Sequence, residues 1–292
     1  MRKISAAFLY RRFFDSIKNM NSVDFVKIAW LGKHFGEEPP LVGKGGSGTI
    51  FFTGCNLRCV YCQNYQISQQ NIGRSYTIKE LTEMMLELEK EGALNINLVS
   101  PTIWAEQIKK ALIMGKKQEL KIPIVWNSNA YENANLIKSL KGLIDIYLPD
   151  FKYGDNGLAL KYSGAINYTE KAKESIREMF FQVGNLKMSE EGIAEKGIIV
   201  RHLILPNNVE NSLKVLEYIK EINKDIYISL MSQYEPLNKA RNFPEINRRI
   251  TKEEFERVYN YQTELELKNG WIQEMESSPT FLPDFNKENP FR

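Results

Sequence analysis

The sequence predicts an α/β protein built on a partial barrel of six parallel strands, with helices covering the outside. Short runs of apolar and β-branched residues alternate with longer runs of helical periodicity, which is typical of parallel β-α units. Two helix-start motifs lie between such runs. Polar and cysteine residues follow directly after several of the strands, where parallel α/β proteins bind their ligands.

The composition is that of a globular protein. Of 292 residues, 43% are hydrophobic and 26% are charged, which excludes a disordered chain. The net charge is only +3, so we expect no nucleic-acid partner, because such binding needs a concentrated basic face. No apolar run approaches the roughly 20 residues of a membrane-spanning helix, and no secretory signal is visible, so we expect no membrane association.

Six strands are expected from the apolar runs, and right-handed crossovers would wind them into an open or partly closed barrel. They cover residues 49–52, 94–99, 122–126, 143–148, 197–205 and 226–230.

Helices are expected between and after these strands. Thr77 and Thr251 each precede a glutamate by three residues, at Glu80 and Glu254, which predicts a capping box at the start of a helix. The expected helices cover residues 78–91, 102–114, 132–140, 169–183, 209–222 and 252–267. We divide the chain into an N-terminal extension (1–42), a core (43–270) and a C-terminal extension (271–292). The basic, amphipathic start of the chain predicts a docking helix or a contact with a partner or membrane surface.

All three cysteines of the chain lie in one short loop after the first core strand. Cys55, Cys59 and Cys62 have the spacing C-x3-C-x2-C, which predicts free thiolates that wrap a metal or cluster in a reducing compartment, the cytoplasm. Structural zinc needs four ligands, and only His34 and His202 could complete the set. A cubane iron–sulfur cluster held by three cysteines would leave one iron open for a substrate.

The cysteine loop carries a family resemblance. C-x3-C-x-aromatic-C, with Tyr61 as the aromatic residue, resembles the signature of the radical S-adenosylmethionine (SAM) superfamily. Residues 46–68 (GSGTIFFTGCNLRCVYCQNYQIS) resemble the pyruvate formate-lyase activating enzymes. The loop of those enzymes has the same C-x2-C-x-Asn ending, which Gln63 and Asn64 finish in this chain. The segments HFGEEPP (34–40), YLPDFKY (147–153), VRHLILP (200–206) and LMSQYEP (230–236) resemble a branch of that group whose substrates are largely unassigned.

The resemblance implies a chemistry. Cys55, Cys59 and Cys62 would hold one [4Fe-4S] cluster, and Tyr61 would contact the adenine side of SAM. Reductive cleavage of SAM would give a 5′-deoxyadenosyl radical that abstracts a hydrogen atom. The implied task is activation of a glycyl radical enzyme. Radical modification of a small molecule or another peptide is an alternative, and a non-catalytic zinc protein is a remote one.

The resemblance also implies an electron donor. The chain has no further cysteines for a second cluster, so electrons would come from an external one-electron donor of the flavodoxin or ferredoxin type.

Asp150 and Lys152 follow the strand at 143–148, and on an extended segment their side chains face the same way. A surface ion pair would explain them, but the activating enzymes have a matching Asp-x-Lys that contacts SAM. Arg201 matches an arginine of the same enzymes and, if buried, needs an anion, which the methionine carboxylate of SAM would supply. Its neighbour His202 must point the other way, and we expect it outside the barrel. Gln233 follows the last strand and joins the expected SAM contacts.

Two strand ends depart from the family pattern. Ser100 and Thr102 stand where activating enzymes have a Gly-Gly-Glu motif. Their hydroxyls could accept hydrogen bonds from SAM, or Thr102 could simply cap the next helix. Asn129 is a further candidate SAM contact, although a turn role explains it equally well, and Ala130 stands where relatives have glycine.

Overall fold

The structure is a computed structural model that describes residues 25–273 and 282–291. The docking helix expected at the start of the chain, in residues 1–14, lies outside these residues. Among the helices in these two ranges, none is both long enough and apolar enough to cross a membrane.

The six expected strands form the parallel centre of one sheet, which confirms the predicted fold class. Within the described residues the sheet has ten strands, and the order along its main path is β10-β9-β8-β6-β5-β4-β2-β1-β3. The six expected strands are β2 (Ser47–Phe52), β4 (Ile96–Val99), β5 (Ile124–Ser128), β6 (Ile146–Pro149), β8 (Ala194–Leu203) and β9 (Tyr227–Met231). Neighbours among them are parallel, so their carboxyl ends share one edge.

Four further strands extend this sheet beyond what the sequence predicted. β1 (Phe25–His34) pairs antiparallel with β2, and β3 (Arg74–Thr77) pairs antiparallel with β1. β10 (Gly270–Gln273) is parallel to β9, and β7 (Lys187–Met188) pairs with β8. Because β1 is mostly half-buried and β7 is only two residues long, neither shows the continuous apolar run of a central strand.

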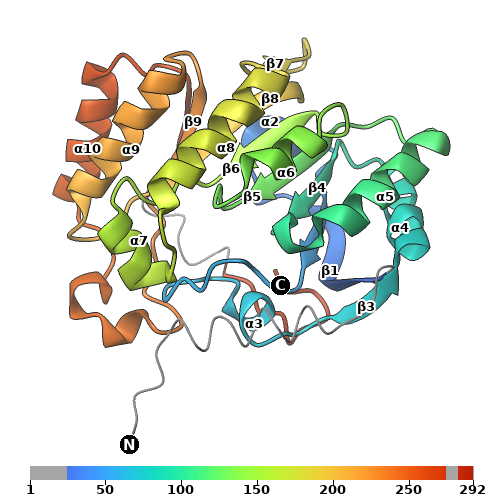
Figure 1. The fold of residues 1–292 in the computed structure, drawn as a ribbon, viewed down its shortest axis with the longest axis horizontal. Coiled ribbons are helices and arrows are strands. Elements are labelled where there is room, and N and C mark those ends of the chain that lie inside the picture. The colour runs from blue at the N-terminus through green and yellow to red at the C-terminus, as the bar shows by residue number, and fades with distance from the viewer. Residues whose placement is uncertain (1–24, 274–281, 292) are drawn as a thin grey trace, which may run out of the picture.

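Helices cover the outer face of the sheet, with α10 and α9 at one end of the row and α5 and α4 at the other (Figure 1). Both capping boxes are present, at Thr77 and Thr251. The helix expected over 102–114 begins with a 3-10 turn, and the polar connection after β6 contains an unexpected helix, α7. The helical elements are α2 (Pro39–Val42), α3 (Tyr65–Ser68), α4 (Ile78–Lys90), η1 (Thr102–Trp104), α5 (Ala105–Lys117), α6 (Ala134–Ser139), α7 (Asn156–Ser163), α8 (Tyr168–Val183), α9 (Val209–Ile222), η2 (Ala240–Asn242), η3 (Pro244–Ile246) and α10 (Lys252–Glu264).

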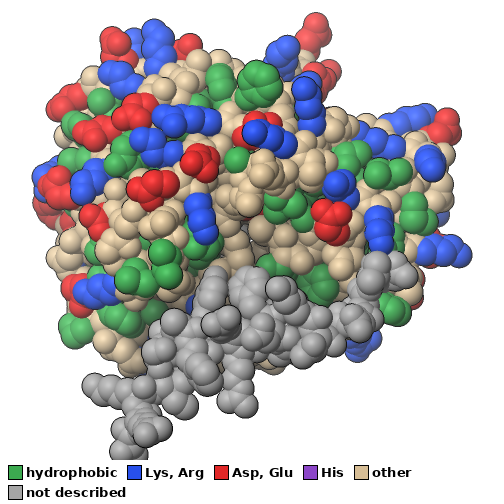
Figure 2. Space-filling model, in the orientation of Figure 1, with side chains coloured by type: hydrophobic (Ala, Val, Ile, Leu, Met, Phe, Trp, Pro, Cys, Tyr) green, Lys and Arg blue, Asp and Glu red, His purple; other side chains and the backbone are tan. Residues whose placement is uncertain are grey.

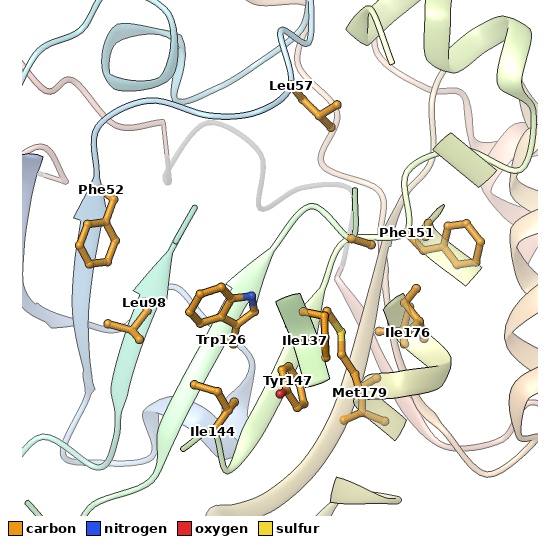
Figure 3. Packing of buried hydrophobic residues seen from close by; sticks show 14 of the residues in the cluster. Phe52, Leu57, Leu98, Trp126, Ile137, Ile144, Tyr147, Phe151, Ile176 and Met179 are labelled. Carbon is orange, nitrogen blue, oxygen red and sulfur yellow. The ribbon is translucent and has the colours of Figure 1, made fainter. Parts of the chain in front are cut away.

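Side chains alternate across the strands and contribute to three buried apolar clusters, the third of which includes Phe51 and Val99. Outward-facing residues such as Trp126 and Tyr147 pack toward Ile137 and Met179 on the helices (Figure 3). Inward-facing neighbours pack in a smaller cluster that includes Leu41 of α2, which fills the inside of the half-barrel. The inner face is therefore closed by apolar residues at one end, and polar side chains gather at the other, where the strands finish.

Figure 2 shows Lys and Arg side chains interspersed with Asp and Glu over the visible helical face.

Candidate active site

One cavity lies at the carboxyl ends of the parallel strands. Its volume is about 240 Å³, and it is lined by segments far apart in the chain: the cysteine loop, the ends of β4, β5, β6, β8 and β9, the loop before α2 and the C-terminal residues Pro283 and Phe291. The structure brings twelve of the thirteen predicted site residues to its wall. These are Cys55, Cys59, Tyr61, Cys62, Gln63, Asn64, Ser100, Asn129, Asp150, Lys152, Arg201 and Gln233.

The cysteine loop begins with a turn that needs glycine. Gly54 has a φ of +92°, and a Cβ there would lie 2.5 Å from Cδ1 of Ile103. A side chain at this position would be strained and would also collide. The turn lets the chain leave β2 and place the first thiol, Cys55, directly at the cavity.

A polar side chain lies beside each thiol. Nδ2 of Asn129 donates to Sγ of Cys55 at 3.3 Å, and the Ser163 hydroxyl donates to Sγ of Cys59 at 2.9 Å. The Ser68 hydroxyl lies 3.3 Å from Sγ of Cys62. Sequence reasoning assigned no role to either serine, although Ser68 is the last residue of the segment 46–68 that resembles the activating enzymes. Hydrogen bonds of this kind orient sulfur ligands and tune a bound metal.

Burial keeps these thiols protonated in the protein alone. It raises the pKa of Cys55 to about 11 and that of Cys62 to about 12, and it also raises the pKa of Cys59. Thiolate is the form that binds metals, so a positively charged centre has to stabilise the deprotonated sulfurs here.

Tyr61 belongs to a chain of hydroxyls that ends at a thiol. Its hydroxyl lies 2.7 Å from that of Tyr153, which lies 2.6 Å from the hydroxyl of Ser163. Ser163 in turn donates to Cys59. The hydroxyl of the motif residue Tyr61 is therefore linked to the thiol of Cys59, in the same loop, through Tyr153 and Ser163.

Four charged side chains form a row along the cavity wall. Nζ of Lys152 is 2.7 Å from Oδ2 of Asp150, and Nε of Arg201 is 2.6 Å from Oδ1 of the same carboxylate. Nη1 of Arg201 lies 3.1 Å from Oε2 of Glu37. The expected side-by-side placement of Asp150 and Lys152 is present, but two protein carboxylates also accompany Arg201, which sequence reasoning did not anticipate.

Asp150, Lys152 and Arg201 in this row hold one another ionised. Burial by itself would raise the pKa of Asp150, but the charges of Arg201 and Lys152 hold that pKa below its ordinary value. Burial opposes the charge of Lys152 too, yet Asp150 raises its pKa. For Glu37 burial dominates, and its pKa is raised despite Arg201.

The loop before α2 carries a second buried carboxylate. Glu38 is 2% exposed, and neither of its carboxylate oxygens has a hydrogen-bond partner among the residues that the structure describes. Burial raises its pKa, with Arg201 opposing that effect. Glu37 and Glu38 lie in the segment HFGEEPP, so the family resemblance was the only signal in the sequence that could have pointed to them.

Thr102 is the predicted site residue that does not line the cavity. Its hydroxyl donates to Oε1 of Glu132 at 2.9 Å, and Trp126 and Ser128 donate to the same buried carboxylate. Ser100 does line the cavity and has a φ of +57°, a left-handed conformation that is uncommon outside glycine. Its role as a contact to SAM stays a prediction.

The two histidines occupy different places. His202 lies outside the barrel, as expected, with Nδ1 2.7 Å from the Phe151 carbonyl and Nε2 2.8 Å from the Ser212 hydroxyl of α9. Each ring nitrogen of His202 therefore has a hydrogen-bond partner. His34 lies at the cavity and packs against Phe291. In the described residues, no three His, Cys, Asp or Glu side chains are grouped to hold a single metal ion.

The fold and the cavity define an α/β half-barrel with a three-cysteine loop at the ligand-binding edge of its sheet. Residues 49–180 match the sequence model of the Radical SAM superfamily. The chain therefore carries a radical SAM domain, as the cysteine signature predicted.

Two relatives are similar over most of this chain. An uncharacterized protein of Methanocaldococcus jannaschii is 35% identical over 235 residues, which are 77% of this chain and 63% of that protein. The chain thus spans less than two thirds of that relative's length. A pyruvate formate-lyase-activating enzyme of Clostridium pasteurianum is 25% identical over 238 residues, which are 76% of this chain and 92% of that enzyme.

Solved structures share the fold. Streptococcus suis SuiB bound to S-adenosylmethionine superposes with a TM-score of 0.54 and 15% identity, covering 80% of this chain and 52% of that one. A mutant of spore photoproduct lyase gives a TM-score of 0.51 and 12% identity, covering 76% of this chain and 74% of that one.

The donor set fits the cofactors that the radical SAM domain implies, a [4Fe-4S] cluster and SAM. Iron–sulfur clusters take thiolate ligands, and the three thiols at the cavity would leave one iron of a cubane open. The charged row beside them offers ammonium, guanidinium and carboxylate groups for the amino-acid end of SAM.

Proposed function

We propose that the protein is a radical SAM enzyme that uses one [4Fe-4S] cluster to cleave SAM reductively for hydrogen-atom abstraction. The single observation that carries the proposal is the meeting of three thiols with Asp150, Lys152 and Arg201 in one cavity. When bound, the cluster would supply the electron that breaks the sulfonium–C5′ bond. We propose residues 43–270 as the catalytic core, flanked by extensions at 1–42 and 271–292.

The protein's own residues would bind and orient the cofactors. Cys55, Cys59 and Cys62 would ligate the cluster, and Ser163 and Asn129 would direct hydrogen bonds to the sulfurs. The other cofactor contacts in the proposal are Tyr61, Gln63, Asn64, Ser100, Thr102, Asp150, Lys152, Arg201 and Gln233.

Thr102 would act indirectly, because its hydroxyl is bound to Glu132. Pro283 and Phe291 of the C-terminal segment line the cavity and would exclude water from the bound cofactors.

The proposed substrate is a glycine in a partner protein, so that the enzyme activates a glycyl radical enzyme. The similarity to the Clostridium pasteurianum activating enzyme, which extends over 92% of that enzyme, supports this task. An external one-electron carrier would be needed as a second partner, and a reducing cytoplasm would suit the three free thiols.

Anaerobic reconstitution tests the cofactor assignment. We expect about four irons with sulfide per chain, an electron paramagnetic resonance (EPR) signal that changes when SAM is added, and release of 5′-deoxyadenosine with dithionite. Cys59→Ala should abolish that release, whereas exposed Lys117→Ala should not change it. One zinc per chain, or unchanged release by the Cys59 variant, would refute the proposal. Incubation with candidate glycyl radical enzymes, followed by EPR for a glycyl radical, tests the substrate.

A further inference from the structure

The cysteine loop is clamped from outside by two chain segments. The backbone amides of Arg58 and Val60 donate to the carbonyls of Ser163 and Tyr162, at the end of α7. On the other side, Lys239 donates its backbone amide to the Val60 carbonyl at 2.8 Å. Figure 1 shows α7, the loop after β2 and the loop between β9 and α10 together at the lower left of the molecule.

On this outer side a surface loop lies close to a proposed cluster ligand. Nδ2 of Asn238 donates to the backbone carbonyl of Cys59 at 3.4 Å, and the next residue, Lys239, is exposed. One hydrogen bond thus separates the residue that holds a thiol from a surface loop. Because electron tunnelling weakens steeply with distance, a redox partner would have to approach from a side as close as this one.

Positive charge is concentrated on these segments. Residues 55–64, 156–163 and 232–250, which we call the clamp face, contain six basic and two acidic side chains, whereas the whole chain has a net charge of only +3. Both acidic side chains are paired within the face, Glu245 with Lys161 and Glu235 with Arg249. Arg248 is paired with Glu254 of α10, outside the face. The basic excess therefore comes from the other basic side chains, among them the exposed Lys239 and Arg241.

The clamp face also has an exposed apolar side chain. Leu160 on α7 is 57% exposed, next to Lys161. Protein interfaces combine such apolar contacts with a charged rim, and opposite charges steer the approach of the partner.

We infer that the clamp face is the docking surface for a small acidic one-electron carrier protein. This inference rests on the proposed function, since it names the partner that delivers the electron to the cluster held by Cys59. Complementary charge would speed the encounter and would make its rate fall with ionic strength.

The test is the double charge reversal Lys239→Glu with Arg241→Glu in the reconstituted enzyme. Neither side chain lines the cavity. With reduced flavodoxin as donor at low salt, we expect cluster reduction and SAM cleavage to slow at least about tenfold. With dithionite, a small reductant, both rates should equal those of the unmodified enzyme. The matched control, Lys117→Glu with Lys121→Glu, reverses two exposed lysines at and just after the end of α5 and should change neither rate.

Three outcomes would overturn the inference. These are a rate with flavodoxin that the double reversal leaves unchanged, an equal slowing by the control, and an equal loss with dithionite. If the unmodified enzyme cleaves no SAM with any reductant, the proposed function fails. The docking surface is then still tested by titrating oxidised flavodoxin, whose affinity the Lys239 and Arg241 reversal should lower and the control should not.

Discussion

Nε of Arg201 donates to Oδ1 of Asp150 at 2.6 Å, across the boundary between β6 and β8. The pairing of the two strands places these residues side by side, because Asp150 and Arg201 form a parallel bridge just beyond Tyr147 and Ile198. A residue that the sequence assigned to SAM is thus already neutralised by the protein. Any anion that enters the cavity must share Arg201 with Asp150 and Glu37.

Asp150→Asn should destabilise the protein because it leaves Arg201 and Lys152 with less compensating charge in a buried site. We expect the free energy of unfolding to fall by about 3 kcal/mol. Urea denaturation measures this free energy of unfolding. Glu87→Gln, which breaks the exposed pair with Lys90, is the control and should cost less than about 0.5 kcal/mol. Equal losses in the two variants would contradict the importance of the buried pair.

His202→Gln should flatten the dependence of stability on pH in acid. Burial lowers the pKa of His202 to about 4 in the folded protein, compared with about 6.5 in the unfolded chain. Between these values the unfolded chain binds more protons, so stability falls as the pH drops, by about 2 kcal/mol at pH 5.

Denaturation of the unmodified protein and of the His202→Gln variant at pH 7.5 and 5 measures this difference. The His202 contribution disappears above about pH 7, so the two proteins should differ there only by a constant. An unchanged slope between pH 7.5 and 5 in the variant would show that His202 titrates normally.

Glu38→Gln should flatten the dependence of stability on pH at the other end of the range, above the ordinary pKa of a glutamate. The raised pKa of Glu38 means that the folded protein keeps a proton which the unfolded chain has lost, so this residue makes stability fall as the pH rises above about 4.3. The variant should lose less stability between pH 5 and 8 than the unmodified protein. Glu83→Gln, at an exposed pair with Lys79, should leave the slope unchanged.

Ser163→Ala should lower the reduction potential of the reconstituted cluster. The Ser163 hydroxyl donates to Sγ of Cys59, and such a hydrogen bond stabilises the added negative charge of the reduced cluster. A redox titration followed by EPR measures the potential. Ser139→Ala, which removes an exposed hydroxyl bound to the Leu136 carbonyl, is the control. A potential that does not change in the Ser163 variant would refute a role in tuning.

The elements with strong local signals were predicted closely. The helix expected over 209–222 has the bounds of α9, and both capping boxes are present, because these features depend on residues a few positions apart. β1 was missed because its residues are mostly half-buried at the side of the sheet. α7 was missed as well, although Asp155 caps it by accepting from the backbone amides of Gly157 and Leu158.

The sequence by itself determined the six central strands and most of the helices between them, the three-cysteine loop and the candidate residues at the strand ends. Periodicity and motif spacing are local properties, so they can be found without coordinates. Only the tertiary structure decided which groups meet in the cavity. Glu37 joins Arg201 across 164 positions, and Ser163 reaches Cys59 across 104, because packing of the half-barrel rather than chain proximity brings them together.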